Sequence, residues 1–377
     1  MSSDSLALWA RPALESFLRP WYQSVSTPHQ AQEDTLARLL QGYRQTAYGT
    51  ERGADQVGTV AEYRHSFPVV TFPQLKPYIE EVMAGNHRAL IPEPPVEWAM
   101  TRGTTGESKY APLTATDIDQ RVACGARALL NYVYRNERYD ILEGWDLNLN
   151  FPSVAGSMVV AGREITYGYS SGIYARHNAQ RAQVKMVPSQ EEVDALGGGI
   201  SPQDWERRFE LASTLARDRD VTAVIGVTQT MLHFASYMKR RWHVYPREVW
   251  DIDLLICTSI AGIHAKYKPA LRALYGDVAI AEIYGATEGL YGQQLDDRPC
   301  VVPNYDTYFF EVQTRGGIKM LHELGRHHYG TLIVSSCLFP RYRIGDLIMC
   351  MGNGYFCVIG RERPLALARY LLDTAFR

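Results

Sequence analysis

Residues 221–289 read VTAVIGVTQTMLHFASYMKRRWHVYPREVWDIDLLICTSIAGIHAKYKPALRALYGDVAIAEIYGATEG and alternate between two kinds of segment. Apolar, strand-like runs occur at 221–227, 251–259 and 278–285, and amphipathic, helix-like segments occupy 228–241 and 266–276. Apolar runs that alternate with helices are typical of parallel strands covered by helices on both faces. This stretch therefore predicts an α/β fold built on a parallel sheet.

The flanking segments extend this prediction. Apolar residues at helical spacing predict two or three helices in the first sixty residues and another over 116–135. Ser201 and Pro202 form a typical helix start for 201–218. Strands are expected within 67–70, 89–101, 145–154, 157–161 and 163–170, and strands should dominate from Tyr308 to Val358.

The composition favours a small-molecule partner. The chain has 377 residues with 39 Lys and Arg against 41 Asp and Glu, so its net charge of -2 gives no reason to expect nucleic acid or an anionic membrane. Apolar runs of about 20 residues and a secretion signal are missing from the sequence, which predicts a cytoplasmic protein. The six cysteines lack metal-ligand spacing, so we expect free thiols.

A polar loop follows the strand-like run at 96–101. Residues 101–109, TRGTTGESK, combine two glycines with hydroxyl groups and Lys109. Glycines allow the backbone to approach an anion, and hydroxyl, amide and ammonium groups can hold a phosphate. The spacing differs from a Walker loop, in which the lysine follows the second glycine directly. Phosphate binding is the functional interpretation, and an ordinary surface turn is the alternative.

Two later segments carry further polar groups. In AEIYGATEG (281–289), Tyr284 beside Gly285 could stack on a base, and Thr287 and Glu288 offer oxygen ligands for Mg2+. Asp346 ends FPRYRIGD (339–346) and Arg361 ends NGYFCVIGR (353–361), and these two side chains could reach a sugar or a phosphate. A capped turn and surface ion pairs are the corresponding alternatives.

Together, in this order, the three segments resemble the adenylate-forming superfamily of acyl-CoA synthetases, luciferases and peptide-synthetase adenylation domains. The resemblance covers about residues 43–361 and is closest to the auxin-responsive acyl acid amido synthetase family. It is carried by RHSFPVVTFPQLKPYIEEVMAGN (64–86), PNYDTYFFEV (303–312) and HHYGTLIVSSCLFPRYRIGD (327–346). It implies a large adenylating domain over 1–361, with two α/β subdomains and a small β-rich subdomain, and a short tail over 362–377.

The resemblance also implies roles for matching residues. ATP and Mg2+ would be the cofactors, Lys109, Thr287 and Glu288 would be catalytic, and Glu288 would be the metal ligand. The nucleotide would be held by Thr101, Thr104, Thr105, Gly106, Ser259, Ala261, Gly262, Tyr284, Gly285, Ala286, Asp346 and Arg361. By position, the acid pocket would be lined by Phe151, Ser153, Gly156, Gly226 and Thr228. The 24 tyrosines and these glycines would suit a flat aromatic acid, although tyrosines are also common in cores.

The activity implied by the resemblance is activation of a carboxylic acid to an acyl-adenylate, with release of pyrophosphate. The acyl group would then pass to an amine, hydroxyl or thiol. One alternative is an acyl-protein synthetase in which Cys350 or Cys357 receives the acyl group. The other is a nucleotide-binding module that lacks turnover.

The chain departs from the family pattern after Arg361, where sixteen residues take the place of the small C-terminal domain. The family's catalytic lysine lies in that domain, and the last lysine of this chain is Lys319. Three explanations remain open: a shortened chain, a naturally short form that makes the adenylate with Lys109 and arginines alone and has loose acceptor choice, or completion by a second polypeptide. His322, His327 and His328 lack an accompanying carboxylate or cysteine set, so we expect loop histidines, and His233 and His264 should be structural.

Overall fold

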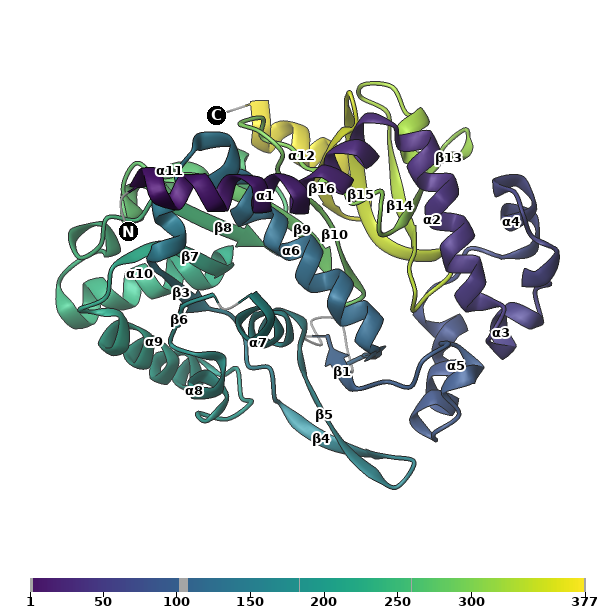
Figure 1. Cartoon of the computed structure of the whole chain (residues 1–377), viewed down its shortest axis with the longest axis horizontal. Helices are drawn as coiled ribbons and strands as arrows, with labels where there is room; N and C mark the ends of the chain where they lie inside the picture. The colour runs from purple at the N-terminus through teal and green to yellow at the C-terminus, as the bar shows by residue number, and fades with distance from the viewer. Residues whose placement is uncertain (1–2, 102–107, 183, 259, 376–377) are drawn as a thin grey trace.

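The computed structural model describes residues 3–101, 108–182, 184–258 and 260–375. Three β-sheets organise the chain (Figure 1). The largest has seven strands in the order β11-β10-β9-β8-β7-β3-β6, in which β9, β8, β7, β3 and β6 run parallel. The expected α/β fold with a parallel sheet is therefore confirmed.

Helices cover both faces of this sheet because its buried strands point apolar side chains in both directions. On one face, Val224 of β7 (Val221–Val227) and Leu255 of β8 (Leu254–Thr258) pack with α9 (Pro202–Ala216), α10 (Thr228–Trp242) and α11 (Lys268–Tyr275). On the other face, Ile225 and Ile256 pack with α1 (Ser3–Ser26), α6 (Ala115–Asn136) and α7 (Ser170–Ala182).

Two smaller sheets flank the large one. A four-stranded sheet has the order β2-β1-β5-β4, from Tyr110–Leu113, Glu97–Met100, Arg163–Tyr169 and Gly156–Val160. An antiparallel five-stranded sheet has the order β13-β12-β14-β15-β16, from Gly317–Met320, Phe309–Thr314, Tyr329–Ser335, Tyr342–Gly352 and Tyr355–Arg361. The strand-rich region expected after Tyr308 is confirmed.

The remaining elements connect these sheets. The other strands are β3 (Trp145–Leu149), β6 (Met186–Val187), β9 (Ala279–Ala286), β10 (Gly289–Gln293) and β11 (Val302–Pro303). The other α-helices are α2 (Pro28–Tyr43), α3 (Ala47–Thr50), α4 (Val60–Ser66), α5 (Phe72–Met83), α8 (Gln190–Asp194) and α12 (Ala366–Ala375). Short 3-10 or π turns are η1 (Ala54–Gln56), η2 (His87–Ala89), η3 (Tyr139–Glu143), η4 (Pro246–Glu248), η5 (Ile263–Tyr267) and η6 (Leu321–Glu323).

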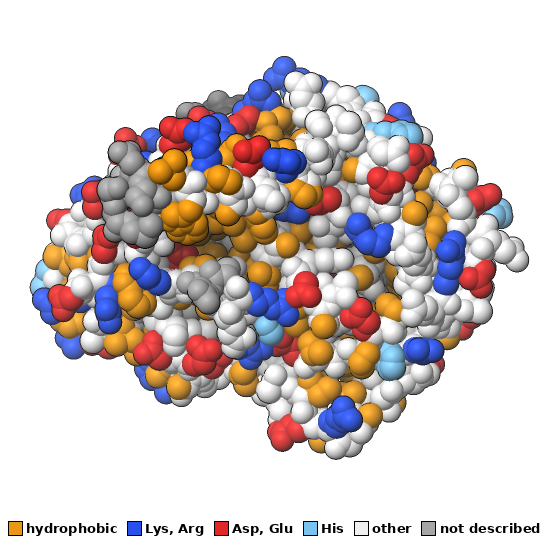
Figure 2. Space-filling model, in the orientation of Figure 1, with side chains coloured by type: hydrophobic (Ala, Val, Ile, Leu, Met, Phe, Trp, Pro, Cys, Tyr) orange, Lys and Arg blue, Asp and Glu red, His pale blue; other side chains and the backbone are white. Residues whose placement is uncertain are grey.

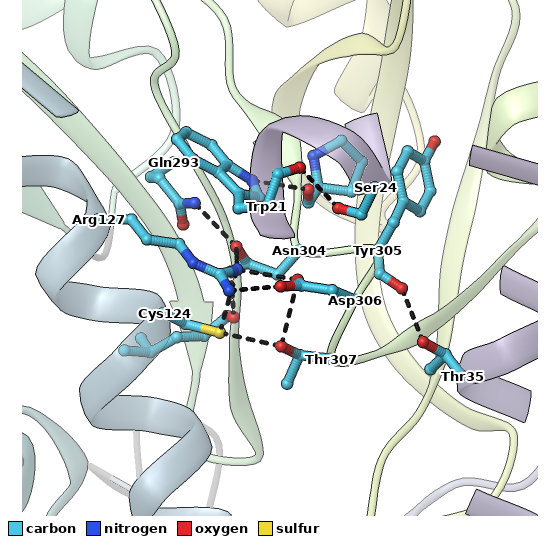
Figure 3. A network of polar contacts seen from close by, with 12 residues as sticks. Trp21, Ser24, Thr35, Cys124, Arg127, Gln293, Asn304, Tyr305, Asp306 and Thr307 are labelled. Carbon is cyan, nitrogen blue, oxygen red and sulfur yellow. Dashed lines mark hydrogen bonds and ion pairs between the residues drawn. The ribbon is translucent and has the colours of Figure 1, made fainter. Parts of the chain in front are cut away.

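A buried polar network fixes helix α6 against the chain that follows β11 (Figure 3). The Arg127 guanidinium donates to Asn304 Oδ1 at 2.6 Å and to Asp306 Oδ1 at 2.9 Å. Asn304 Oδ1 also accepts a hydrogen bond from Gln293 Nε2 at 2.8 Å. Hydrogen bonds to charged groups contribute more to stability than neutral ones, so this network holds the orientation of α6 and of the side chains one or two turns earlier on it.

Helices α5 and α7 occupy segments in which the sequence did not predict a helix. Residues 67–70 form only an isolated bridge, from Val70 to Tyr342, and α5 begins immediately afterwards. Pro73 lies in the first turn of α5 and Gln74 caps the Thr71 backbone, a local start signal that outweighs the proline-rich appearance of the segment. Helix α7 was also missed, because its apolar periodicity is weak.

The surface carries both signs of charge. Figure 2 shows Lys and Arg side chains interspersed with Asp and Glu over the visible face. Within the described ranges, every helix is either too short or too polar to cross a lipid bilayer.

Candidate nucleotide and acid site

Three residues that the sequence singled out meet where the seven-stranded and five-stranded sheets adjoin. Tyr284 of β9 donates its hydroxyl hydrogen to Asp346 Oδ2 at 3.0 Å, and Arg361 Nη1 lies 3.0 Å from Asp346 Oδ1. Asp346 of β15 is the register partner of Arg361 of β16. The Asp346 side chain is 14% exposed and that of Arg361 is 61% exposed, so the cluster has a buried acceptor and an accessible cation.

Glu288 lies beside this cluster, in the turn that joins β9 to β10. Burial raises the pKa of its carboxyl group, whereas a hydrogen bond from Tyr342 and the positive charges of Arg121 and Arg361 oppose that shift. Burial likewise raises the pKa of Asp346, against the effect of Arg361. Two partly buried carboxylates near two arginines form a site that can bind both a cation and an anion.

Arg121 was not predicted from the sequence. Its side chain is 2% exposed, its Nε donates to Asp117 Oδ2 at 2.5 Å, and its Nη1 donates to Ser170 Oγ at 3.2 Å. Its Nη2 is buried and has no hydrogen-bond partner among the residues that the structure describes. A buried N–H group without a partner is costly, and a carboxylate or phosphate oxygen would satisfy it. The sequence signal that could have identified Arg121 is its position on the apolar face of the amphipathic segment that forms α6.

The expected phosphate loop is described only at its base. The Thr101 backbone N–H donates to Lys109 O, and the Lys109 N–H donates to Thr101 Oγ1, both at 2.9 Å. Lys109 is exposed, and its Nζ lies 5.1 Å from the ring centroid of Phe72. Thr104, Thr105, Gly106 and Ser259 lie outside the described residues. Phosphate binding by this loop, including catalysis by Lys109, therefore stays a prediction.

The residues expected around adenine follow neighbouring parallel strands. Ala261 and Gly262 come after β8, and Tyr284, Gly285 and Ala286 form the end of β9, which pairs with β8. Gly262 has a φ of 74°, a left-handed conformation that suits glycine. Because carboxyl ends of parallel strands commonly form ligand sites, this edge is a suitable place for a nucleotide.

His264 supports the same edge. Its Nε2 is 2.9 Å from Gln294 Oε1, and burial lowers the pKa of its imidazole. A buried, hydrogen-bonded histidine agrees with the structural role expected for it.

The segments expected to line the acid pocket meet in an aromatic cluster. The Phe151 ring lies 5.2 Å from Tyr169 and 4.9 Å, edge-on, from Trp205. Val227, at the end of β7, belongs to the same cluster, and Met100, at the end of β1, packs against it. Trp205 and Tyr169 were not predicted; the aromatic character of their segments is visible in the sequence, but their proximity depends on the fold.

The other predicted pocket residues have structural partners. The Ser153 backbone N–H donates to Asp194 Oδ1 at 2.7 Å, and its hydroxyl also bonds that carboxylate. Thr228 Oγ1 donates to Thr258 O at 3.1 Å. A Cβ atom on Gly156 would lie 2.4 Å from the Tyr167 hydroxyl, and one on Gly226 would lie 2.8 Å from Leu149 O. Direct contact of these four positions with an acid stays a prediction.

The cysteines proposed as acyl acceptors are poorly suited to that role. Cys350 is buried in β15, where burial raises the pKa of its thiol to about 12. The pKa of Cys357 is also raised, chiefly by its hydrogen bond with Cys300 and then by burial. A thiol with a raised pKa carries little thiolate, the nucleophilic form.

The histidines were also considered as metal ligands. His327 and His328 are exposed, as expected for loop histidines, and His322 packs edge-on against Tyr305. His233 was expected to have a structural role, but its side chain is exposed on α10. The described part of the chain holds no group of three or more histidine, cysteine, aspartate or glutamate side chains placed to bind a metal.

Comparison with known proteins places this chain in a family. The GH3 family N-terminal domain matches residues 18–251. The chain belongs to the GH3 family. The GH3 chain is 33% identical over 395 residues to the indole-3-acetic acid-amido synthetase GH3.8 of Oryza sativa subsp. indica, with 85% of this chain and 64% of that protein aligned. It is 22% identical to the Arabidopsis thaliana indole-3-acetic acid-amido synthetase GH3.15, over 89% of this chain and 68% of that protein.

Solved structures show the same fold. The acyl acid amido synthetase AtGH3.15 in complex with 2,4-DB superposes with a TM-score of 0.73 at 18% identity, covering 94% of this chain and 71% of that chain. A 2-hydroxyisobutyryl-CoA ligase in complex with 2-HIB-AMP gives 0.63 at 14% identity, covering 91% and 72%. The GH3 chain thus has the adenylate-forming fold. In these relatives, the part that this chain does not match belongs to the same polypeptide as the matched part. The comparisons therefore do not support completion of the chain by a second polypeptide.

Proposed function

We propose that this chain is an ATP-dependent acid-adenylating ligase. It activates a carboxylic acid to an acyl-adenylate, releases pyrophosphate and transfers the acyl group to an acceptor. The observation that carries the proposal is the Tyr284, Asp346 and Arg361 cluster beside Glu288 at the carboxyl edge of the parallel sheet. Family membership and the adenylate-forming fold support it.

The described residues fit a nucleotide. A carboxylate offers about four acceptor positions, and Tyr284 and Arg361 each occupy one on different oxygens of Asp346. The remaining positions can accept two ribose hydroxyls. The exposed guanidinium of Arg361 can then contact the sugar or a phosphate oxygen, and the Tyr284 ring can lie along the base.

Charge neutralisation and positioning supply the catalysis. The acid's carboxylate oxygen attacks the α-phosphorus of ATP as pyrophosphate leaves, a displacement helped mainly by fixed charges around the phosphate. Arg121 has an Nη2 without a partner among the described residues, and we assign to it the orientation of an anionic oxygen near Glu288. Thr287, next to Glu288, is proposed to contact the same phosphate.

A divalent cation fits the site through one protein carboxylate. Mg2+ usually takes one or two carboxylates and completes its shell with phosphate oxygens and water. Glu288 would hold it, and a bound Mg2+ would neutralise charge on the departing pyrophosphate.

We further propose an aromatic acid and an amine acceptor. The cluster of Phe151, Tyr169 and Trp205 gathers three aromatic rings, an environment that would suit the ring of an aromatic acid. The curated relatives are named indole-3-acetic acid-amido synthetases, which supports an amide product. The first of them is matched over 64% of its length, so its substrates serve here as the first probes.

The test is acid-dependent exchange of labelled pyrophosphate into ATP. Indole-3-acetate, benzoate and an aliphatic acid are compared, and exchange is expected with an aromatic acid. Glu288→Gln should lower the exchange rate about 100-fold, because it removes a charge that neutralises the polyphosphate. Asp277→Asn is the matched control, since it removes an exposed carboxylate that pairs with Arg272 at the surface. ATP binding without exchange for any acid would identify a nucleotide-binding module instead.

A further inference from the structure

Two cysteines meet where the two larger sheets adjoin, at a point that the proposed reaction does not use. Cys300 precedes β11 of the seven-stranded sheet, and Cys357 lies in β16 of the five-stranded sheet. Their Sγ atoms are 3.1 Å apart. Cys357 is partly exposed, so a small solute can reach the pair.

The backbone is already arranged for a cross-link. Val301 and Phe356 exchange both backbone hydrogen bonds, at 3.0 and 2.9 Å. Cys300 and Cys357 are the next residues outward, which corresponds to a non-hydrogen-bonded antiparallel pair with Cα atoms about 4.5 Å apart. That separation lies within the range that disulfides span, so the bond requires little movement of the backbone.

We propose that Cys300 and Cys357 are a redox modification site, at which a hydroperoxide converts the two thiols into a reversible disulfide. The Cys300 sulfur, as thiolate, attacks one oxygen of hydrogen peroxide, and the O–O bond breaks to leave a sulfenic acid and hydroxide. The Cys357 sulfur then attacks the Cys300 sulfur. The hydroxyl group of the sulfenic acid leaves with the Cys357 proton as one water. The hydroxide from the first step takes up the proton that Cys300 released and becomes the second water. Two thiols are oxidised, and the peroxide is reduced to two waters.

The other cysteines provide a contrast. Burial raises the pKa of the thiols of Cys124 and Cys257, whereas the hydrogen bond from Cys357 lowers the pKa of Cys300. Of Cys124, Cys257 and Cys300, only Cys300 has the sulfur of another cysteine within hydrogen-bond distance among the residues that the structure describes. Thiolate character and a resolving cysteine are the two properties that favour disulfide formation.

The bond would connect the two sheets that build the candidate nucleotide site. Tyr284 and Asp346 already join these sheets through a hydrogen bond, and Arg361 lies on the same strand as Cys357. A disulfide would add a covalent tie at this junction. Because a cross-link restricts the unfolded chain, the oxidised protein should be harder to unfold than the reduced protein.

The experiment treats the full chain with hydrogen peroxide, blocks the remaining thiols and measures the intact mass. We expect two fewer blocked thiols than in the untreated protein, a peptide map linking Cys300 to Cys357, reversal by dithiothreitol and a higher urea midpoint for the oxidised form. Cys300→Ser and Cys357→Ser should each abolish the linked peptide. Cys337→Ser, which removes another partly exposed thiol, should retain it.

Peptide mapping of the unaltered protein keeps the test valid if a serine variant fails to fold. Oxidation of Cys357 to a sulfinic acid without a linked peptide, or a linked peptide containing another cysteine, would overturn the proposal. An unchanged thiol count after peroxide treatment would overturn it as well. None of these readouts depends on adenylation, so failure of the proposed function would leave this test unaffected.

Discussion

Replacing Asp346 with asparagine tests the nucleotide site most directly, because the substitution changes charge with little change in shape. In the structure, Asp346 accepts hydrogen bonds from Tyr284 and Arg361, one on each carboxylate oxygen. The asparagine side chain would offer one acceptor oxygen, and its amide group would face one of the former donors. The substituted site could therefore accept one ribose hydroxyl in place of two.

The size of the effect follows from this count. Two charge-assisted hydrogen bonds to the ribose would be replaced by one neutral bond, a loss of about 2–3 kcal/mol. That loss corresponds to a Kd for ATP roughly 30- to 150-fold higher. Folding should be affected less, because Arg361 is 61% exposed and water can solvate its guanidinium when the ion pair is removed.

Isothermal titration with ATP gives the Kd, and pyrophosphate exchange gives the KM for ATP and the rate at saturation. Glu362→Gln is the matched control: Glu362 follows Arg361 and pairs with Arg343 at 2.6 Å in an exposed position. An exposed pair contributes up to about 1 kcal/mol, so the control should change the Kd less than about fivefold. A folded Asp346→Asn protein with an unchanged Kd and a reduced saturated rate would refute the ribose role.

Three further substitutions test other parts of the structure. Phe151→Leu should raise the KM for an aromatic acid up to about tenfold and leave the KM for ATP unchanged, because it removes ring contacts with Tyr169 and Trp205. Equal effects on the KM values of aromatic and aliphatic acids would contradict the proposed acid pocket. Arg121→Lys should lower the rate of pyrophosphate exchange about 10- to 100-fold while the circular dichroism spectrum stays native, because lysine keeps the positive charge but lacks the planar guanidinium fork. An exchange rate equal to that of the wild type would show that Arg121 is not part of the site. Burial raises the pKa of Asp146 to about 7, so the folded chain retains a proton that the unfolded chain releases above about pH 4. The free energy of unfolding of the wild type should therefore fall as pH rises over that interval. Measured by urea unfolding, Asp146→Asn should be more stable than the wild type by up to about 4 kcal/mol at about pH 8 and by less at about pH 5. A stability difference that is the same at both pH values would contradict a buried, protonated Asp146.

The expected helix and strand segments agree with the structure wherever the local signal is strong. Apolar runs such as 221–227 have to be buried on both faces, and the amphipathic segments between them supply the cover, so the parallel sheet follows from composition and order. Helix α9 begins where Ser201 and Pro202 predict it, with a capping box to Asp204. Helix α7 was missed because its low amphipathic contrast leaves only tertiary contacts to favour a helix.

Local sequence was enough to single out Tyr284, Glu288, Asp346 and Arg361 for the candidate nucleotide site, because these residues stand in motifs that can be recognised over a few positions. That they meet depends on the tertiary structure: the β15–β16 register places Asp346 opposite Arg361, and the junction of two sheets brings Tyr284 to the same carboxylate. The partners of Arg121, of Trp205 and of the Cys300–Cys357 pair could not be predicted from neighbouring residues. Their contacts join segments distant in sequence, and such contacts depend on how sheets and helices pack rather than on neighbouring residues.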